Sequence, residues 1–296
     1  MMPLRESSRP PRTAVRFSAS GAAGWSLALL LVQGVAAGVV RPRGSTGPID
    51  FVSFGVVSLV ALLVVLFGVV RVHGPDASLR EVLGLDESPL AFPPAAPPRA
   101  VLVHRVATAL FALVVGVALV GVDAAVDDFF SARDASYRDD LAKLYELLEA
   151  PTTRARAARL LGLGLVQPLA ELAFYFGVVF GGLRRPRSRG LAAGLTLVFF
   201  VLHASDIRAA PVRLLLGLPL LLARMGTGTI VASAVGTVAF NALEVMDLGR
   251  GAKLVGGPPA LWAAVALVGI AALALLARQA KRWRLGEFAD RLDLRA

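Results

Sequence analysis

The amino-acid sequence predicts an all-α membrane protein, a polytopic helical bundle with about eight transmembrane helices. Hydrophobic residues make up 56% of the 296-residue chain, and its mean hydropathy is +0.69. They are gathered in long blocks, whereas a soluble domain of this length would interleave them with charge. Because the blocks are solidly apolar and lack the two-residue alternation of a transmembrane β-barrel, we expect helices.

Eight apolar blocks follow one another along the chain. Phe17–Val40 contains no charged residue and Phe51–Val70 is equally clean, so each supplies the roughly 20 residues that a spanning helix needs. The other six blocks, several of them shorter, are Val106–Val122, Leu160–Leu183, Leu191–Ser205, Leu214–Ala223, Ile230–Leu243 and Ala260–Ala277. Arg213 and Arg224 bracket one short block, so the count of spans is eight to within one or two.

The net charge of +10 lies mainly at the ends of the blocks. Basic clusters precede the first block, follow the fourth and follow the last: Arg5, Arg9, Arg12 and Arg16; Arg184, Arg185, Arg187 and Arg189; Arg278, Lys281, Arg282 and Arg284. With eight spans, all three clusters lie on one side of the membrane, which the positive-inside rule makes cytoplasmic. We therefore expect a multi-pass protein of the inner (cytoplasmic) membrane with both termini in the cytoplasm. Its basic loops are expected to contact anionic lipids, and no nucleic acid is expected as a partner.

Polarity divides the chain into four regions. These are 1–122, with three spans and a cytoplasmic linker at 71–100; 123–159, a charged connector; 160–277, the core with nearly all intramembrane polar groups; and 278–296, a basic cytoplasmic tail. In the connector, apolar side chains recur at helical spacing: Tyr137, Leu141, Leu144, Tyr145 and Leu148. This pattern predicts an amphipathic helix on the far interface, either beside a substrate entrance or as a plain connector.

Glu171 is the most informative side chain of the core region, because it lies in the middle of an apolar block. Burying a carboxylate there costs about 2.5–3.5 kcal/mol even on lenient insertion scales. Gln167 and Tyr175 lie four residues before and after it, so the three side chains share one helix face. Pro168 is expected to kink this helix. An intramembrane carboxylate of this kind indicates a functional site.

Two further blocks carry polar side chains along one face. Phe199 and His203 fall one turn apart on the first, and Ser233, Thr237 and Asn241 form a stripe on the second that Glu244 extends. The cheapest arrangement turns these faces and that of Glu171 toward one another. In such a pocket Glu171 serves as a general base for water, His203 orients water or protonates the leaving group, and Asn241 donates to an oxyanion. The alternative is that these groups are interhelical hydrogen bonds without catalytic function.

These residues resemble the CAAX protease and bacteriocin-processing family of intramembrane peptidases. The family's Pro-x-x-Glu-Glu-x-x-x-Arg-Gly motif matches here at Pro168, Glu171 and Gly177, and an Arg pair follows at Arg184 and Arg185. Its Phe-x-x-x-His motif matches Phe199 and His203, and the Asn of its His-x-x-x-Asn motif matches Asn241. Leu83-Gly84-Leu85 is also similar to a sequence common in the family. The similarity covers residues 155–245 well and the first half loosely.

Three positions depart from the family pattern. Leu172 replaces the second Glu, Phe176 the Arg, and Thr237 the His of the third motif. Glu171, His203 and Asn241 alone are a poor zinc set, so we expect no metal and no cofactor. Tyr175 is expected to supply a hydrogen bond in place of the missing Arg.

Two functions follow from the resemblance. The first is an intramembrane endopeptidase that cleaves a membrane-anchored peptide substrate, with Glu171, His203 and Asn241 as catalytic residues and Tyr175, Thr237 and Phe199 in support. The alternative is a catalytically inactive member that binds membrane peptides as an immunity or assembly factor. An unrelated transporter or lipid-binding bundle is a third class, for which broken helices in paired halves would be the sign. The oligomeric state is left open.

Overall fold

A computed structural model describes residues 15–16, 18–40, 51–74, 77–85, 98–147, 149–150, 152–184, 189–203, 207–248 and 257–293. Over these ranges the chain forms helices and turns and no strand, which confirms the all-α fold. Within the described ranges, six helices are long and apolar enough to cross a membrane: Ala19–Gly38, Gly55–His73, Arg99–Ser131, Thr153–Leu183, Ala210–Thr227 and Pro259–Lys281. Gly190–Leu202 and Val231–Met246 are shorter apolar helices. The protein is therefore a helical membrane protein.

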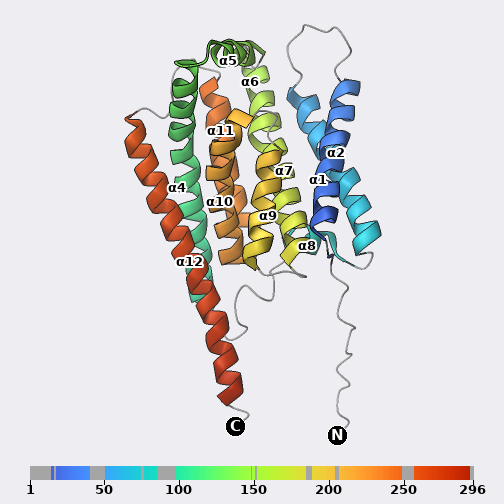
Figure 1. The fold of residues 1–296 in the computed structure, drawn as a ribbon, viewed down its shortest axis with the longest axis vertical. Coiled ribbons are helices and arrows are strands. Elements are labelled where there is room, and N and C mark those ends of the chain that lie inside the picture. Colours follow the sequence, from blue (N-terminus) through green and yellow to red (C-terminus); the bar gives the residue numbers. More distant parts are fainter. Residues whose placement is uncertain are drawn as a thin grey trace.

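The long helices stand side by side in one bundle (Figure 1). The elements in chain order are α1 (Ala19–Val40), α2 (Phe51–His73), α3 (Leu79–Val82), α4 (Pro98–Ser131), α5 (Ala135–Leu147), α6 (Thr153–Arg159), α7 (Gln167–Leu172), α8 (Phe180–Arg184), α9 (Arg189–Leu202), α10 (Ala210–Thr227), α11 (Val231–Leu248) and α12 (Pro259–Asp293). α1 packs on α2 at one side, and α12 packs on α4 and α10 at the other. The predicted boundary at residue 122 falls inside α4, which packs on α10, α11 and α12.

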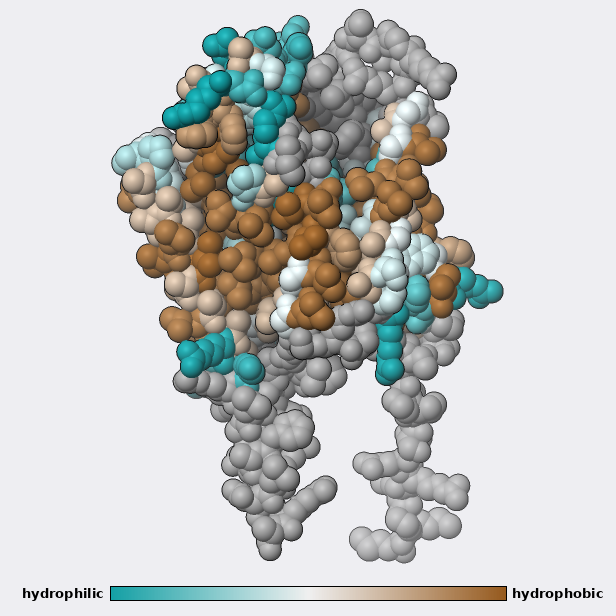
Figure 2. Space-filling model, in the orientation of Figure 1, coloured by the Kyte–Doolittle hydropathy of each residue, from teal (hydrophilic) through white to brown (hydrophobic). Residues whose placement is uncertain are grey.

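Apolar side chains cover the middle of the face shown in Figure 2, with hydrophilic residues gathered above and below them. Large hydrophobic side chains project outward from several helices; Val35 is 70% exposed, Phe67 74% and Val268 68%. Such a continuous apolar exterior would aggregate in water, whereas lipid solvates it.

The helix that carries Glu171 is interrupted by two wide turns. A π-helical segment covers Leu160–Val166 and another covers Ala173–Val179, so α7 is a short α-helical piece between them. Pro168 explains the first, because proline has no N–H and its ring clashes with the carbonyl four residues earlier. The N–H of Gln167 reaches back five residues to the oxygen of Gly162, which widens the helix before the proline. Wide turns of this kind are frequent at functional sites.

The connector forms three segments rather than one helix. α4 continues to Ser131, α5 lies across the ends of the bundle helices in Figure 1, and α6 begins the next span. On α5, Tyr137 and Leu141 are half-buried, while Leu144 and Tyr145 are exposed; Leu148 lies outside the described residues. A helix in this position has the geometry of an interfacial helix.

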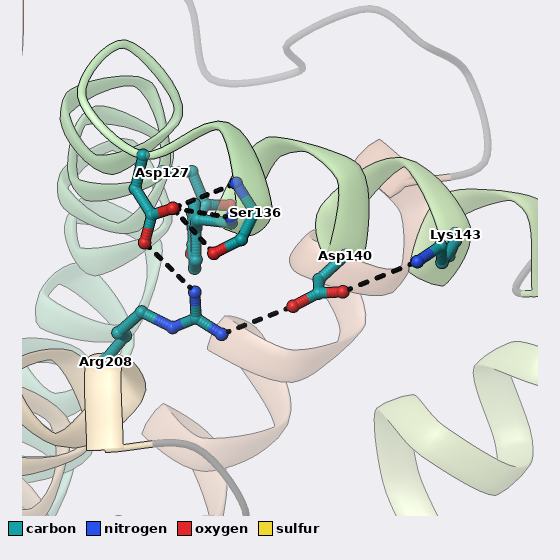
Figure 3. A network of polar contacts seen from close by, with 7 residues as sticks. Asp127, Ser136, Asp140, Lys143 and Arg208 are labelled. Carbon is teal, nitrogen blue, oxygen red and sulfur yellow. Dashed lines mark hydrogen bonds and ion pairs between the residues drawn. The ribbon is translucent and has the colours of Figure 1, made fainter.

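Polar contacts fix α5 at its first turn (Figure 3). The Asp134 carboxylate caps the helix, accepting hydrogen bonds from the Ser136 hydroxyl at 2.6 Å, the Ser136 N–H at 2.9 Å and the Tyr137 N–H at 3.3 Å. Arg208, from the single turn Ile207–Ala209, lies 3.5 Å from Asp134 and 3.5 Å from Asp140. Arg208 therefore ties α5 to the loop that precedes α10.

The cap on α5 should depend on pH. The Ser136 hydroxyl and the Tyr137 N–H hold the pKa of Asp134 below its usual range. A carboxyl whose pKa is lowered by folding stabilises the fold above its ordinary pKa, about 3.9, and loses this contribution as the pH falls through the lowered value.

We expect Asp134→Ala to speed amide hydrogen exchange along α5 at neutral pH, because the capping acceptor is lost. The exposed Asp139→Ala should leave exchange unchanged. After correction for intrinsic rates, wild type and Asp134→Ala should converge well below pH 4. Equal exchange at pH 7 would show that the cap does not hold α5.

Candidate functional site

The carboxylate of Glu171 is surrounded by polar groups from three segments of the bundle. It is 7% exposed, and its Oε1 accepts a hydrogen bond from Gln167 Nε2 at 3.1 Å. Arg213 of α10 donates from Nη1 to Oε2 at 3.2 Å. His203, directly after α9, places Nε2 3.6 Å from Oε1. These contacts satisfy both oxygens of a carboxylate that would otherwise be costly to bury.

Tyr175 reaches this cluster through the histidine. Its hydroxyl lies 3.1 Å from His203 Nδ1, and its side chain is fully buried beside the ring of Phe200. The two nitrogens of His203 therefore face Tyr175 on one side and Glu171 on the other. The contact at Nδ1 decides which nitrogen carries the proton, and so whether Nε2 can donate to Glu171. Tyr175 is thus a positioning residue for His203 rather than a direct partner of Glu171.

A cavity of about 360 Å³ opens beside Glu171. Its wall comes from α4, α5, α7, α9, α10 and α11, together with Phe176 and Ala209 from the segments next to them. The polar lining residues are Asp123, Glu171, Arg213, Thr237, Asn241 and Glu244. Leu144 of α5 borders it, so the cavity extends from Glu171 toward the end of the bundle that α5 covers.

The predicted site residues divide between the cavity wall and the layer behind it. Glu171, Thr237 and Asn241 line the cavity. His203 contacts Glu171 from behind the lining, and Tyr175 contacts His203. The amide of Asn241 donates to the Thr237 carbonyl on its own helix at 2.8 Å, which occupies one of the N–H groups expected to face an oxyanion.

Phe199 does not lie on this wall. Its neighbour Phe200 does, because consecutive residues of a helix point about 100° apart. Among the other polar side chains, Ser233 donates to the Leu220 carbonyl at 2.7 Å and so joins α11 to α10, while Thr196 donates to Ala192 within α9. These two serve as structural hydrogen bonds.

Sequence reasoning missed Arg213 as a site residue. Arg213 and Arg224 had marked the ends of an apolar block, yet both lie within α10, an 18-residue helix. Arg213 shares the cavity face with Leu216 and Leu220, three and seven residues later. That spacing was the available signal, since it places the arginine on the inward face of the helix.

Arg224 also lies inside the bundle. It is 4% exposed and donates from Nε to the Phe176 carbonyl at 3.3 Å. Phe176 is the position where the family motif has an arginine, so a cation from another helix lies against the backbone there.

The donor set around Glu171 does not form a metal centre. Within the described ranges, no group of three or more His, Asp or Glu side chains is placed to hold a metal ion. Arg213 also occupies one oxygen of Glu171, and a cationic guanidinium disfavours a metal ion at the same carboxylate. The expectation of no zinc stays a prediction.

The fold and the site together define a class: an α-helical membrane protein with a charged cavity inside its helix bundle. Comparison of the chain with protein-family models, with curated proteins and with solved structures gave no match. The resemblance to intramembrane peptidases therefore rests on the motif residues of this sequence.

Proposed function

We propose that the protein is an intramembrane endopeptidase that hydrolyses a peptide bond of a membrane-anchored peptide or protein. The observation that carries the proposal is the Glu171 carboxylate, held among Gln167, His203 and Arg213 on the wall of a cavity inside the membrane-spanning bundle. A buried carboxylate next to an imidazole and a guanidinium, open to a ligand-sized space, has the groups that water activation and oxyanion stabilisation need.

The proposed topology has eight spans with both termini in the cytoplasm. The six long helices and the two shorter apolar ones, Gly190–Leu202 and Val231–Met246, supply the passes. In Figure 1, α1 begins and α12 ends at the same end of the bundle, opposite α5. The basic clusters of the sequence flank these ends, which favours the cytoplasm of a cell bounded by an inner membrane.

In the proposed reaction, Glu171 accepts a proton from a water molecule while the water oxygen attacks the carbonyl carbon of the substrate. Arg213 stabilises the negative charge that develops on the carbonyl oxygen, the role expected from Asn241 on sequence grounds. The proton on Glu171 then passes to the leaving nitrogen as the C–N bond breaks. His203, positioned by Tyr175, holds Glu171 in place through Nε2.

Peptide binding without hydrolysis is the second candidate function. It is favoured by the 3.2 Å contact between Arg213 and Glu171, because a carboxylate that already accepts from Arg213 and Gln167 has less capacity left for water. Leu172, Phe176 and Thr237 at the family's motif positions point the same way.

Glu171→Gln separates the two functions, because it keeps the shape of the side chain and removes the base. We expect purified protein in lipid vesicles to cleave members of a library of single-span peptides, and Glu171→Gln to lose about 10²–10⁴-fold in rate. Mass spectrometry of the products gives the readout.

Glu146→Gln is the matched control, because Glu146 is an exposed carboxylate on α5. This variant should cleave the peptides at the wild-type rate. Undiminished cleavage by Glu171→Gln would rule out its role as base. Peptide binding by wild type and by Glu171→Gln, with no cleavage by either, would favour the second function.

A further inference from the structure

The cavity beside Glu171 is lined by more acidic than basic side chains. Asp123 of α4 and Glu244 of α11 line it together with Glu171, and Arg213 is the cation among the described lining residues. Arg213 is already bonded to Glu171. Among the described residues, no hydrogen bond or ion pair joins a cation to Asp123 or to Glu244.

Asp123 and Glu244 lie in one electrostatic environment. Asp123 lies within electrostatic range of Glu244 and Asp127, and Glu244 lies within range of Asp127 and of Arg213. Asp127 itself accepts a hydrogen bond from Tyr137 of α5. A cationic group placed between these two carboxyl groups would favour their ionised form and be attracted to it.

Thr237 gives an independent sign of a ligand. Its side chain is 4% exposed and lines the cavity, and its hydroxyl has no hydrogen-bond partner among the described residues. A buried hydroxyl without a partner destabilises the empty site, so a ligand that bonds to it gains affinity. Thr237 lies on α11 one turn before Asn241 and two before Glu244, so all three share a face toward the cavity. The hydroxyl is thus placed to contact a polar ligand that reaches from Glu244 toward Glu171.

We propose that the cavity binds a cationic group of its ligand, an ammonium or guanidinium, between Asp123 and Glu244. The shared chemistry is positive charge with N–H donors, which either a basic side chain or a free amino terminus supplies. That this ligand is also the substrate rests on the proposed peptidase function; the charge preference itself does not. The backbone of the ligand then lies along Thr237 and brings a peptide bond to Glu171.

The cavity reaches the end of the bundle that α5 covers, because Leu144 of α5 borders it. In the proposed topology this end faces away from the cytoplasm, so the ligand enters from the outer side of the membrane.

The test is equilibrium binding of matched fluorescent peptides to the full chain in nanodiscs. Three apolar peptides of one length are compared: one with a lysine and an acetylated amino terminus, one with glutamine and a free amino terminus, and one with glutamine and an acetyl group. We expect a cationic peptide to bind wild type at least about tenfold more tightly than the neutral one. Which of the two cationic peptides shows the preference identifies the source of the charge.

The double variant Asp123→Asn, Glu244→Gln should abolish this preference, so that the cationic peptides bind no more tightly than the neutral one. Asp139→Asn removes an exposed charge at the same end and should keep the preference. The double variant should melt no lower than wild type, because like charges are removed, so a loss of selectivity cannot be attributed to unfolding.

Equal binding of charged and neutral peptides to wild type, or a preference that survives in the double variant, would overturn the inference. Mass spectrometry of the bound peptide reports cleavage separately. Selectivity without cleavage therefore contradicts only the peptidase function, and cleavage without selectivity contradicts only the charge preference.

Discussion

Arg213→Met should destabilise the folded protein by about 3 kcal/mol. The substitution keeps the length of the side chain but leaves Glu171 buried without its cationic partner. Removing one member of a buried ion pair costs about 3–5 kcal/mol, and we expect the lower end because the Arg213 side chain is 27% exposed. The free energy of unfolding is measured by titrating the protein in mild detergent with dodecyl sulfate and monitoring tryptophan fluorescence.

Arg208→Met is the matched control. Its side chain is also 27% exposed, but its partners Asp134 and Asp140 are 43% and 58% exposed. Ion pairs between exposed groups contribute at most about 1 kcal/mol, so this loss should be small. The comparison isolates the burial of the carboxylate as the cause.

A double-mutant cycle with Glu171→Gln completes the test. Once Glu171 is neutral, Arg213→Met should cost much less than in wild type, because no buried carboxylate is left unpaired. If Arg213→Met costs the same in both backgrounds, the two side chains do not interact. Arg213 would then be a packing residue, and its proposed role near the oxyanion would lose its basis.

Helical spacing alone predicted much of the site around Glu171. Gln167 donates to Glu171, Tyr175 contacts His203, and His203, the polar group expected on the next helix, lies 3.6 Å from the carboxylate. This works because polar groups in a membrane gain most by meeting one another. The all-helical fold was predictable for a related reason, since lipid requires every backbone group to be bonded internally.

Arg213 was not predictable in the same way. An arginine at the edge of an apolar block usually extends toward the lipid headgroups, and only the packing of α10 inside the bundle, on α4, α9, α11 and α12, turns it to Glu171. The wide turns around α7 are a second limit. A proline can be accommodated in a helix either by a kink or by a π-helical turn, because both avoid the hydrogen bond that its missing N–H cannot make. The local sequence around Pro168 does not distinguish the two, and the structure has the π-helical turn.

Gly177→Ala should destabilise the bundle by about 2–3 kcal/mol, because the glycine lies against the backbone of another segment. A methyl group at this position would lie 2.3 Å from the carbonyl oxygen of Leu83 and 2.7 Å from its carbon. The turn that carries Leu83 cannot retreat easily. The oxygen of Gly84 accepts from the Ile230 N–H at 3.0 Å, and Gly84 itself has φ 71° and leaves room for Arg224.

Gly181→Ala is the control within the same span, since no atom lies within 4 Å of the added methyl group. This variant should be neutral or slightly stabilising, as alanine favours a helix over glycine by about 1 kcal/mol. Equal effects of the two substitutions would show that the turn at Leu83 does not pack on Gly177.

The effect of Gly177→Ala should extend to the site, because Gly177 lies in the same π-helical segment as Tyr175. A methyl group that displaces this segment would lengthen the contact between Tyr175 and His203, and with it the support of Glu171. We therefore expect Gly177→Ala to lower peptide cleavage even at temperatures where the protein stays folded, and Gly181→Ala to leave cleavage intact. The packing of Leu83 on this glycine would then link the first half of the chain to the chemistry of the second.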